Sequence, residues 1–293
     1  MCKDQIVRTF ARWIVVLPLL AGTGCTSKTD DPAAASGAAA DGAKAAADGG
    51  KAKGGEPEAK AASLPEAEVL LTKAVDAAGG ADAFAKVKSF YYEGQLVIAS
   101  QKLEARSKVW WKEGNFYTEQ DMVGVGEVRA GKKGESIWSS DPINGQRVLT
   151  GLEAEQVAWA SSLMIAADWK RYFDKAETVK EDTIEGKKVY IVKLTSKSGG
   201  EMELQFDVES GLQTGFSFVQ ETAMGKMPIS LSLQDYREVG GVKLAYKQIT
   251  EMPIASATLE IMDLKLNPEI SDARFEMPRA DAEVVAQPPA ATP

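Results

Sequence analysis

Histidine, cysteine and the carboxylates decide which chemistry this chain can carry. None of its 293 residues is histidine, which excludes Ser-His-Asp and Cys-His nucleophile systems and histidine metal ligation. Its two cysteines, Cys2 and Cys25, both lie near the N-terminus, which excludes a disulfide inside a folded domain and a four-cysteine metal site. The many carboxylates mostly alternate with apolar residues, as on a solvated sheet face. We therefore expect no enzymatic activity, no metal and no cofactor, with a paired-carboxylate hydrolase as the alternative that composition alone leaves open.

The charge balance narrows the class of partner. The chain has 34 basic and 42 acidic residues, a net charge of −8, and this disfavours nucleic acid as a partner. The length permits one large domain or two small ones. Because no Pro/Gly-rich linker interrupts residues 63–278, we predict a single domain there.

The first residues have the layout of an export signal. Residues 1–12 carry Lys3, Arg8 and Arg12, and an apolar run of nine residues, 13–21, follows. As a helix, this run rises only about 14 Å, whereas the hydrocarbon core of a bilayer is about 30 Å thick. The run is too short to span a membrane, and its length is typical of a signal peptide.

A cysteine follows this run in the setting that a lipid attachment site requires. Gly22-Thr23-Gly24 precedes Cys25, and the segment resembles a bacterial lipoprotein signal, although Gly22 stands where that pattern usually has leucine. The resemblance implies that residues 1–24 are removed and that Cys25 carries acyl chains such as palmitate. Thr26 resembles the residue that directs export to the outer membrane. We predict a lipid-anchored protein of the outer membrane that faces the periplasm; an ordinary secretory signal is the alternative.

Two further segments lack the residues needed for a core. Residues 26–62 are rich in Ala and Gly and contain no Val, Ile, Leu, Met or aromatic residue, so residues 25–62 are predicted to form the acylated cysteine and a flexible tether. Residues 279–293 are predicted to be a disordered tail. The domain between them carries the charge of −8, which anionic membrane surfaces repel. A water-facing role is therefore favoured.

Inside the domain, helix signals are few and strand signals many. Capping-box patterns at Ser63–Glu66 and Thr150–Glu153 predict helices that run to Ala78 and to about Trp169. Ala81–Val87 is predicted as a second short helix. Elsewhere, β-branched and aromatic runs alternate with polar residues between Gly-containing turns, which predicts about a dozen strands. The predicted strands are 89–100, 102–112, 115–122, 175–184, 188–196, 201–208, 212–222, 228–238, 242–252 and 256–266, with further short ones between 122 and 150.

Short turns between so many strands indicate an antiparallel meander, and a sheet of this size must curl or split. We predict a mainly β (α+β) domain: a strongly curved antiparallel sheet, or half-barrel, with helices covering its concave apolar face.

Five fragments share a pattern with known proteins: Ala74–Ser89, Gly131–Trp138, Phe206–Leu212, Asp235–Leu244 and Ile270–Phe275. Together they resemble the outer-membrane lipoprotein-sorting (LolA/LolB-like) family. They are strand, turn and hairpin motifs, so they specify fold better than function. The resemblance implies a half-closed antiparallel sheet over helices, with an apolar cavity for acyl chains.

The resemblance also implies candidate ligand-binding residues. In the membrane-anchored branch, the loop between the third and fourth strands projects an exposed apolar residue, and here that stretch contains Met122, Val123 and Val125. These residues are predicted to form a lip; a simple hairpin whose apolar residues point inward is the alternative.

Aromatic and methionine side chains suit adaptable apolar pockets, so Trp110, Trp138, Leu163 and Met164 are further candidates, with ordinary core packing as the alternative. The predicted function is a non-catalytic, membrane-tethered protein that binds a lipid or the acyl chains of another lipoprotein, as an acceptor rather than a shuttle. The alternatives are a module that binds another envelope protein, as an envelope sensor would, and a scaffold without a ligand.

Overall fold

The computed structural model describes residues 63–278 except residues 125, 143 and 223–224. The predicted signal peptide, Cys25, the tether and the C-terminal tail lie outside these residues.

Within the described residues, thirteen strands form one antiparallel sheet in the order β6-β5-β4-β3-β2-β1-β13-β12-β11-β10-β9-β8-β7. Strands that are consecutive in the chain pair with each other, except β6 and β7, which lie at the two edges of the sheet. In addition, β1 pairs with β13, which brings the two ends of the domain together. The strands are β1 (Ser89–Ile98), β2 (Leu103–Lys112), β3 (Asn115–Met122), β4 (Gly126–Lys133), β5 (Ser136–Asp141), β6 (Gly145–Leu149), β7 (Lys175–Ile184), β8 (Lys187–Thr195), β9 (Glu201–Asp207), β10 (Gln213–Thr222), β11 (Gly225–Val239), β12 (Val242–Met252) and β13 (Ala255–Leu266).

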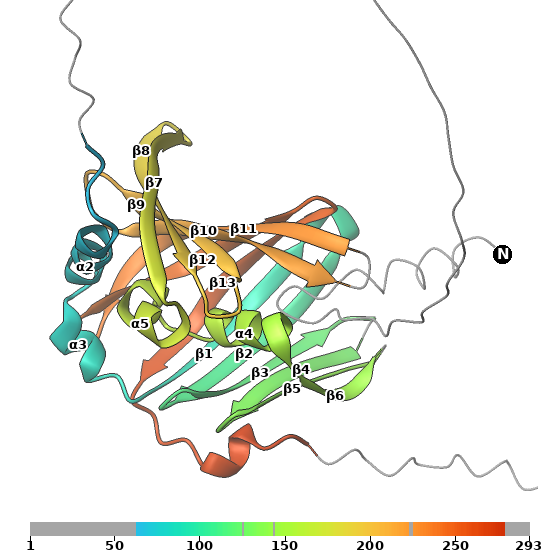
Figure 1. Cartoon of the computed structure of the whole chain (residues 1–293). Helices are drawn as coiled ribbons and strands as arrows, with labels where there is room; N and C mark the ends of the chain where they lie inside the picture. The colour runs from blue at the N-terminus through green and yellow to red at the C-terminus, as the bar shows by residue number, and fades with distance from the viewer. Residues whose placement is uncertain (1–62, 125, 143, 223–224, 279–293) are drawn as a thin grey trace, which may run out of the picture. The chain divides into compact units, whose positions relative to one another are not determined.

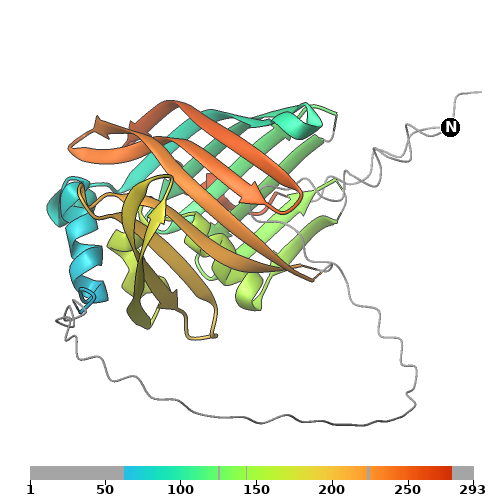
Figure 2. The same ribbon diagram turned by 90° about the horizontal axis from the view of Figure 1, so that it is seen from above.

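The sheet is curved and open. It curls around the helices that pack on its inner face (Figures 1 and 2), and the edge strands β6 and β7 each have one neighbour in the sheet. The predicted half-barrel with helices on its concave face is therefore confirmed.

The helices are short. They are α2 (Ala67–Ala77), α3 (Ala81–Ala85), α4 (Gly151–Ala160) and α5 (Ile165–Tyr172), with 3₁₀ turns η1 (Ala99–Gln101) and η2 (Asp272–Phe275). No helix among the described residues is both long and apolar enough to cross a bilayer. The second predicted helix starts at its capping box, with Thr150 as the N-cap residue, whereas α2 starts later than predicted, with Glu66 rather than Ser63 at the N-cap position. Neither Glu66 nor Thr150 makes a capping bond through its side chain.

The helix predicted to run from 151 to about 169 is two helices. Ser161 and Ser162 end α4: their amides bond to carbonyls three residues back, and the Ser161 hydroxyl donates to the Ala158 carbonyl at 2.7 Å. Serine hydroxyls compete in this way with the helical hydrogen bonds. The chain then restarts as α5 at Ile165, which leaves a short irregular connection over the concave face.

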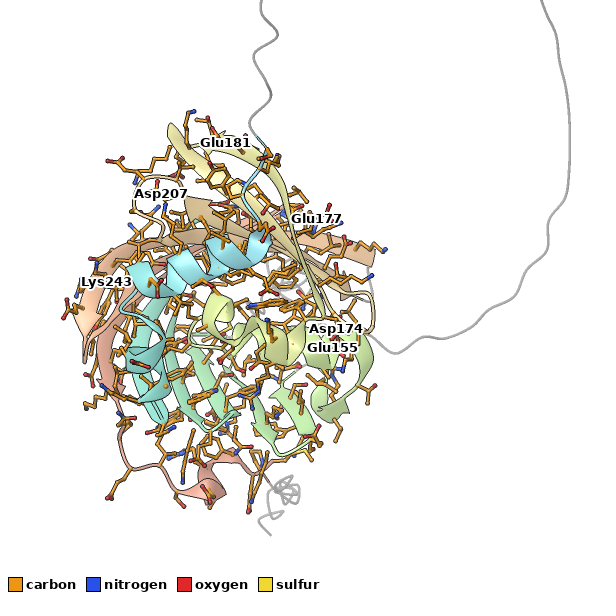
Figure 3. All side chains as sticks on the ribbon, turned by 60° about the vertical axis from the view of Figure 1, so that its left-hand side comes forward. Glu155, Asp174, Glu177, Glu181, Asp207 and Lys243 are labelled. Carbon is orange, nitrogen blue, oxygen red and sulfur yellow. The ribbon has the colours of Figure 1, made fainter. Side chains whose placement is uncertain are left out.

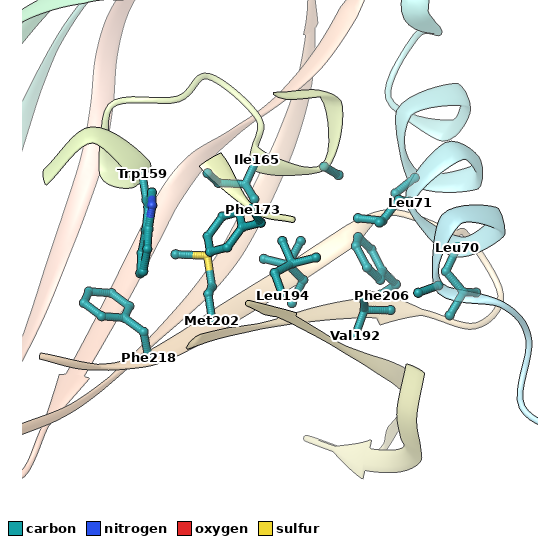
Figure 4. Packing of buried hydrophobic residues seen from close by; sticks show 14 of the residues in the cluster. Leu70, Leu71, Trp159, Ile165, Phe173, Val192, Leu194, Met202, Phe206 and Phe218 are labelled. Atoms are coloured by element: carbon teal, nitrogen blue, oxygen red, sulfur yellow. The ribbon is translucent and has the colours of Figure 1, made fainter. Parts of the chain in front are cut away.

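The core has two parts on the inner face. One joins α2, α4 and α5 to β8–β11 through residues such as Leu71, Trp159, Phe173 and Phe206 (Figure 4). The other joins α4 to β1–β6 and includes Phe116 and Val157. Both clusters lie on the inward-facing alternate positions of the strands, as the period of two requires.

Candidate functional site

A cavity of about 120 Å³ lies between the inner face of the sheet and the connection from α4 to α5. Its wall is mostly aromatic and aliphatic. The apolar lining residues are Phe90, Trp159, Leu163, Met164, Ile165, Phe216, Leu233, Leu244, Ala245, Ile261 and Leu264, and the polar ones are Tyr92, Ser162, Gln213, Tyr236, Lys243 and Gln248.

One wall of the cavity is a two-stranded arm that separates from the rest of the sheet. Pairing between β10 and β11 ends at Gly215 and Ser232, and pairing between β12 and β13 ends at Lys247 and Glu260. Residues 233–246, which we call the arm, therefore have ladder partners only within β11 and β12. The gaps on both sides of the arm make room for the cavity.

The arm is tied to the body at its tip, where β11 turns into β12, and at Tyr236 nearer its base. The Lys243 amide donates to the Ala78 carbonyl at 2.7 Å, next to the C-terminal end of α2. A Cβ on Gly79 would lie 2.2 Å from the Gly241 carbonyl oxygen, and Gly79 has φ +124°. Only glycine permits this approach. The Tyr236 hydroxyl spans the gap between β11 and β10 and donates to the Gln213 carbonyl at 2.5 Å.

The connection between α4 and α5 forms the roof. Ser162, Leu163 and Met164 line the cavity from above the sheet. Because the break between the two helices places this irregular segment over the concave face, the roof is not a continuous helix. It is the part of the cavity wall with the least regular backbone.

Polar groups without partners face this apolar space. Gln213 is 4% exposed, and its Oε1 has no hydrogen-bond partner. Among the described residues the Tyr92 hydroxyl makes no hydrogen bond, and burial raises the Tyr92 pKa to about 12. Burial also raises the pKa of Tyr236. Buried polar groups without partners are uncommon in native proteins, and the Gln213 Oε1 is one that belongs to the wall of the cavity.

The volume limits what the cavity holds in this conformation. A dry apolar cavity of about 150 Å³ accommodates benzene, whereas this cavity measures about 120 Å³. Drug-sized ligands occupy pockets of about 300–1,000 Å³. A long acyl chain therefore requires the roof or the arm to move outward.

Of the predicted site residues, Leu163 and Met164 line this cavity. Trp110 and Trp138 lie on the opposite face of the sheet. There, Tyr91, Trp110, Tyr117, Gly131 and Trp138 stand directly opposite one another on five consecutive strands. We call this row the outer ladder.

The outer ladder is covered by the chain's own C-terminal segment, drawn in red on the side of the sheet away from α4 and α5 (Figure 1). The Arg274 guanidinium carbon lies 4.7 Å from the centre of the Trp110 ring, and the Trp138 Nε1 donates to the Phe275 carbonyl at 3.4 Å. Trp138 and Phe275 are 1% and 0% exposed. These tryptophans thus serve a second, outer core.

The three lip residues have different positions. Met122 is 2% exposed and packs into the inner core beside Leu96 and Val128. Val123 is 74% exposed at the turn between β3 and β4. Val125, like Cys25, lies outside the described residues. Of the two described lip residues, only Val123 has the exposure that a lip requires.

None of the cavity's polar residues was among the predicted site residues. Tyr92 could have been placed from strand parity, because Phe90, Leu96 and Ile98 on the same strand are apolar at even positions. Gln213 and Lys243 have no such signal. Their position depends on where the pairing of β10 and β12 with their neighbours ends, which no local pattern encodes.

Acidic side chains offer little for metal chemistry in the described part of the chain. There, no three of them gather in an arrangement that could hold a metal ion. Glu155 accepts hydrogen bonds from the Ser196 and Ser198 hydroxyls, both at 2.8 Å. This group fixes the loop after β8 to α4 and contains no histidine to activate a serine.

No protein-family model matches the sequence, and no curated protein matches it. Solved structures do match. A DUF1329 family protein from Desulfovibrio piger is 14% identical, with a TM-score of 0.50, over 73% of this chain and 98% of that one. A LolA superfamily protein from Nitrosomonas europaea is 15% identical, with a TM-score of 0.49, over 73% and 99%.

A further match is an outer membrane lipoprotein-sorting protein domain from Vibrio parahaemolyticus, at 12% identity and a TM-score of 0.46, over 71% of this chain and 95% of that one. At these identities the likeness concerns fold alone. The sheet that the LolA/LolB-like resemblance implies, open, curved and antiparallel, is the sheet observed, and the match to the Desulfovibrio piger structure concerns the same fold.

Proposed function

We propose that this chain is a lipid-anchored protein of the outer membrane that faces the periplasm and binds acyl chains without covalent chemistry. The observation that carries the proposal is the inner cavity, walled by an arm that is free of the sheet on both sides and roofed by an irregular segment. Each methylene that moves from water into such a cavity contributes about 0.8 kcal/mol. The predicted anchor at Cys25 favours an acceptor over a shuttle.

To hold an acyl chain, the small cavity would have to open. The arm is tied to the body by few contacts, and the roof contains no regular hydrogen-bonded backbone over Ser161–Met164 beyond the end of α4. Movement of either would enlarge the space along the concave face without breaking the two cores. The enlarged space would still be lined by apolar side chains such as those of Trp159 and Phe216.

Native mass spectrometry tests lipid binding. The full chain with Cys25→Ser, which removes the predicted acylation, is exported to a periplasm and kept free of detergent. We expect a retained lipid-sized mass that organic extraction removes. A chain that remains without ligand after incubation with phospholipids and diacylated peptides would contradict the proposal.

A matched pair of variants locates the ligand. Leu163→Asp places a charge in the roof of the cavity and should remove the retained mass. Val148→Asp, at an exposed position of β6, should leave it unchanged. Equal retention by both variants would place the ligand elsewhere.

The anchor and the lip have separate tests. Labelled palmitate should enter the unmodified chain and not Cys25→Ser. Val123→Glu should slow lipid transfer to or from acceptor vesicles, because the exposed Val123 is proposed as the lip. Unaltered uptake and release would remove the lip from the proposal.

The second candidate function, binding of another envelope protein, is supported by the apolar exposure of Val123 and Met262. These side chains are 74% and 59% exposed and border one shallow depression on the outer face. If this function is correct, Met262→Glu should reduce cross-linking to a partner in the cell envelope while lipid retention is unchanged.

A further inference from the structure

The charges around the inner cavity differ from those of the whole chain. The chain has a net charge of −8, yet no Asp or Glu is among the described residues that line the cavity, and Lys243 is the single charged residue in that lining. Because Lys243 is exposed and also lines the cavity, it lies where the cavity opens to solvent, which we call the mouth. Figure 3 shows Lys243 on the side of the domain where α2 lies, with Glu155 and Asp174 on the opposite side.

The Lys243 ammonium is not neutralised by a neighbour. Glu238 stands opposite it in the register of the arm, but among the described residues no ion pair involves Lys243 or Glu238. The backbone of Lys243 is fixed by its amide bond to Ala78. The side chain is therefore held at the mouth by its backbone and left without an anion.

The interior supplies two further groups that need partners. Gln213, 4% exposed, has an unpartnered Oε1, and its amide can turn to present either a donor or an acceptor. The Tyr92 hydroxyl is a free donor inside the same cavity. A hydrocarbon chain alone would leave both groups unpaired, at the cost that buried polar groups without partners carry.

We propose that the ligand is an amphiphile with an anionic head group, bound with its chain in the inner cavity and its head group toward Lys243, Gln213 and Tyr92. This inference rests on the proposed function and names its substrate class. A carboxylate or a phosphate monoester can accept hydrogen bonds from an ammonium, an amide and a phenol together. A neutral or cationic head group cannot use Lys243.

The net charge of the whole protein makes it possible to distinguish specific binding of an anion from non-specific association. A net charge of −8 attracts cations and repels anions at long range. Non-specific association would therefore favour a cationic amphiphile. A preference for the anion has to come from the local groups at the cavity.

Binding of twelve-carbon probes of one chain type tests the head group. Dodecanoate, dodecyl phosphate, dodecanol, methyl dodecanoate and dodecylamine are titrated into the full chain with Cys25→Ser, below their micellar concentrations, with tryptophan fluorescence as the readout because Trp159 lines the cavity. At least one of the two anions should bind about tenfold more tightly than the alcohol, the ester and the amine, a difference of about 1.4 kcal/mol. The stronger of the two anions identifies the source of the head group.

Variants in the same background assign the preference to the cavity. Lys243→Met should remove the preference for the anion and leave binding of dodecanol unchanged, whereas Lys247→Met, on the same strand but outside the cavity lining, should change neither. Gln213→Met and Tyr92→Phe should each weaken binding of the anion more than binding of the alcohol.

The results separate the two proposals. Equal affinity for the anions and the alcohol, tightest binding of the amine, or an unchanged preference in Lys243→Met would overturn the head-group inference while acyl binding stands. Failure of every probe to bind would overturn the proposed function as well.

Discussion

Strand β1 carries two aromatic surfaces back to back, and they differ in what they leave unsatisfied. On the inner side, Phe90 and Tyr92 line a cavity with unpartnered polar groups. On the outer side, Tyr91 begins the outer ladder, which ends at Trp138 under the chain's own C-terminal segment. Both surfaces are rich in aromatic residues. Only the inner one has room and hydrogen-bonding capacity left for another molecule.

The difference shows how to separate structural aromatics from binding ones. In the outer ladder each ring has a neighbouring ring, a cation or a carbonyl: the centres of Trp110 and Tyr117 are 5.5 Å apart, and those of Tyr117 and Trp138 are 5.9 Å apart. A surface that satisfies its own groups contributes to stability. The inner surface leaves the buried Gln213 Oε1 without a partner, at a cost in stability that binding can recover.

Of the variants proposed, Trp138→Ala should cause the largest loss of folding stability. Trp138 is 1% exposed, and a Cβ on Gly131 would lie 2.5 Å from its ring, so the indole lies flat on β4. Removing such a side chain typically costs about 3–5 kcal/mol. Urea denaturation should show this loss, and affinity for the acyl probes should be unchanged in the folded variant.

Two results would contradict this difference between the two faces of the sheet. A loss of stability below about 1 kcal/mol would mean that the outer ladder is not a second core. A large loss of affinity would mean that the two faces are coupled. Trp159→Phe, on the inner face, is the matched variant, because Trp159 belongs to both the core and the cavity; it should change affinity as well as stability.

The next largest effect is a loss of folding stability at alkaline pH, caused by the Tyr92 phenol. Burial raises its pKa to about 12, whereas an unfolded tyrosine has a pKa of about 10. Below pH 10 both states hold the proton, so nothing is lost. Between pH 10 and about 12 the unfolded state releases it first, and stability falls by at most about 3 kcal/mol for this one group.

Tyr92→Phe should remove this part of the alkaline destabilisation. Stability measured in urea at several pH values should fall less steeply for the variant than for the unmodified chain in this interval. A phenol that ionises near pH 10 in the folded chain and disappears in Tyr92→Phe would show that Tyr92 is solvated rather than enclosed.

Much of the fold could be predicted from local patterns. Period-two alternation and glycine turns placed the strands from 175 to 266 within a few residues, because those signals act over short distances. The predicted helix from Thr150 to Trp169 was wrong in its continuity. The two serines at 161 and 162 are weak signals in sequence, yet they produce the roof of the cavity.

The site was less predictable, for two different reasons. Trp110 and Trp111 could have been separated by parity, since Leu103, Ala105, Val109 and Trp111 share the inward side of β2, and the prediction chose Trp110. The arm could not have been predicted. It exists because ladder pairing stops at Ser232 and Lys247, a property of the whole sheet's curvature.

Arg274→Met should cause the smallest loss of folding stability, and it tests how much the C-terminal segment stabilises the outer ladder. The guanidinium lies over Trp110 and Tyr117, at 4.7 and 5.6 Å from the ring centres, and is exposed. Exposed cation–π contacts contribute about 0.5–1 kcal/mol each, so we expect a loss of about 1 kcal/mol in urea denaturation. Lys133→Met, which removes an exposed ion pair with Glu276 of 2.6 Å, should cost less, and its effect should shrink in salt. If Arg274→Met costs nothing while acyl affinity falls, the C-terminal segment acts on the cavity rather than on the outer ladder, and the division between the two faces fails.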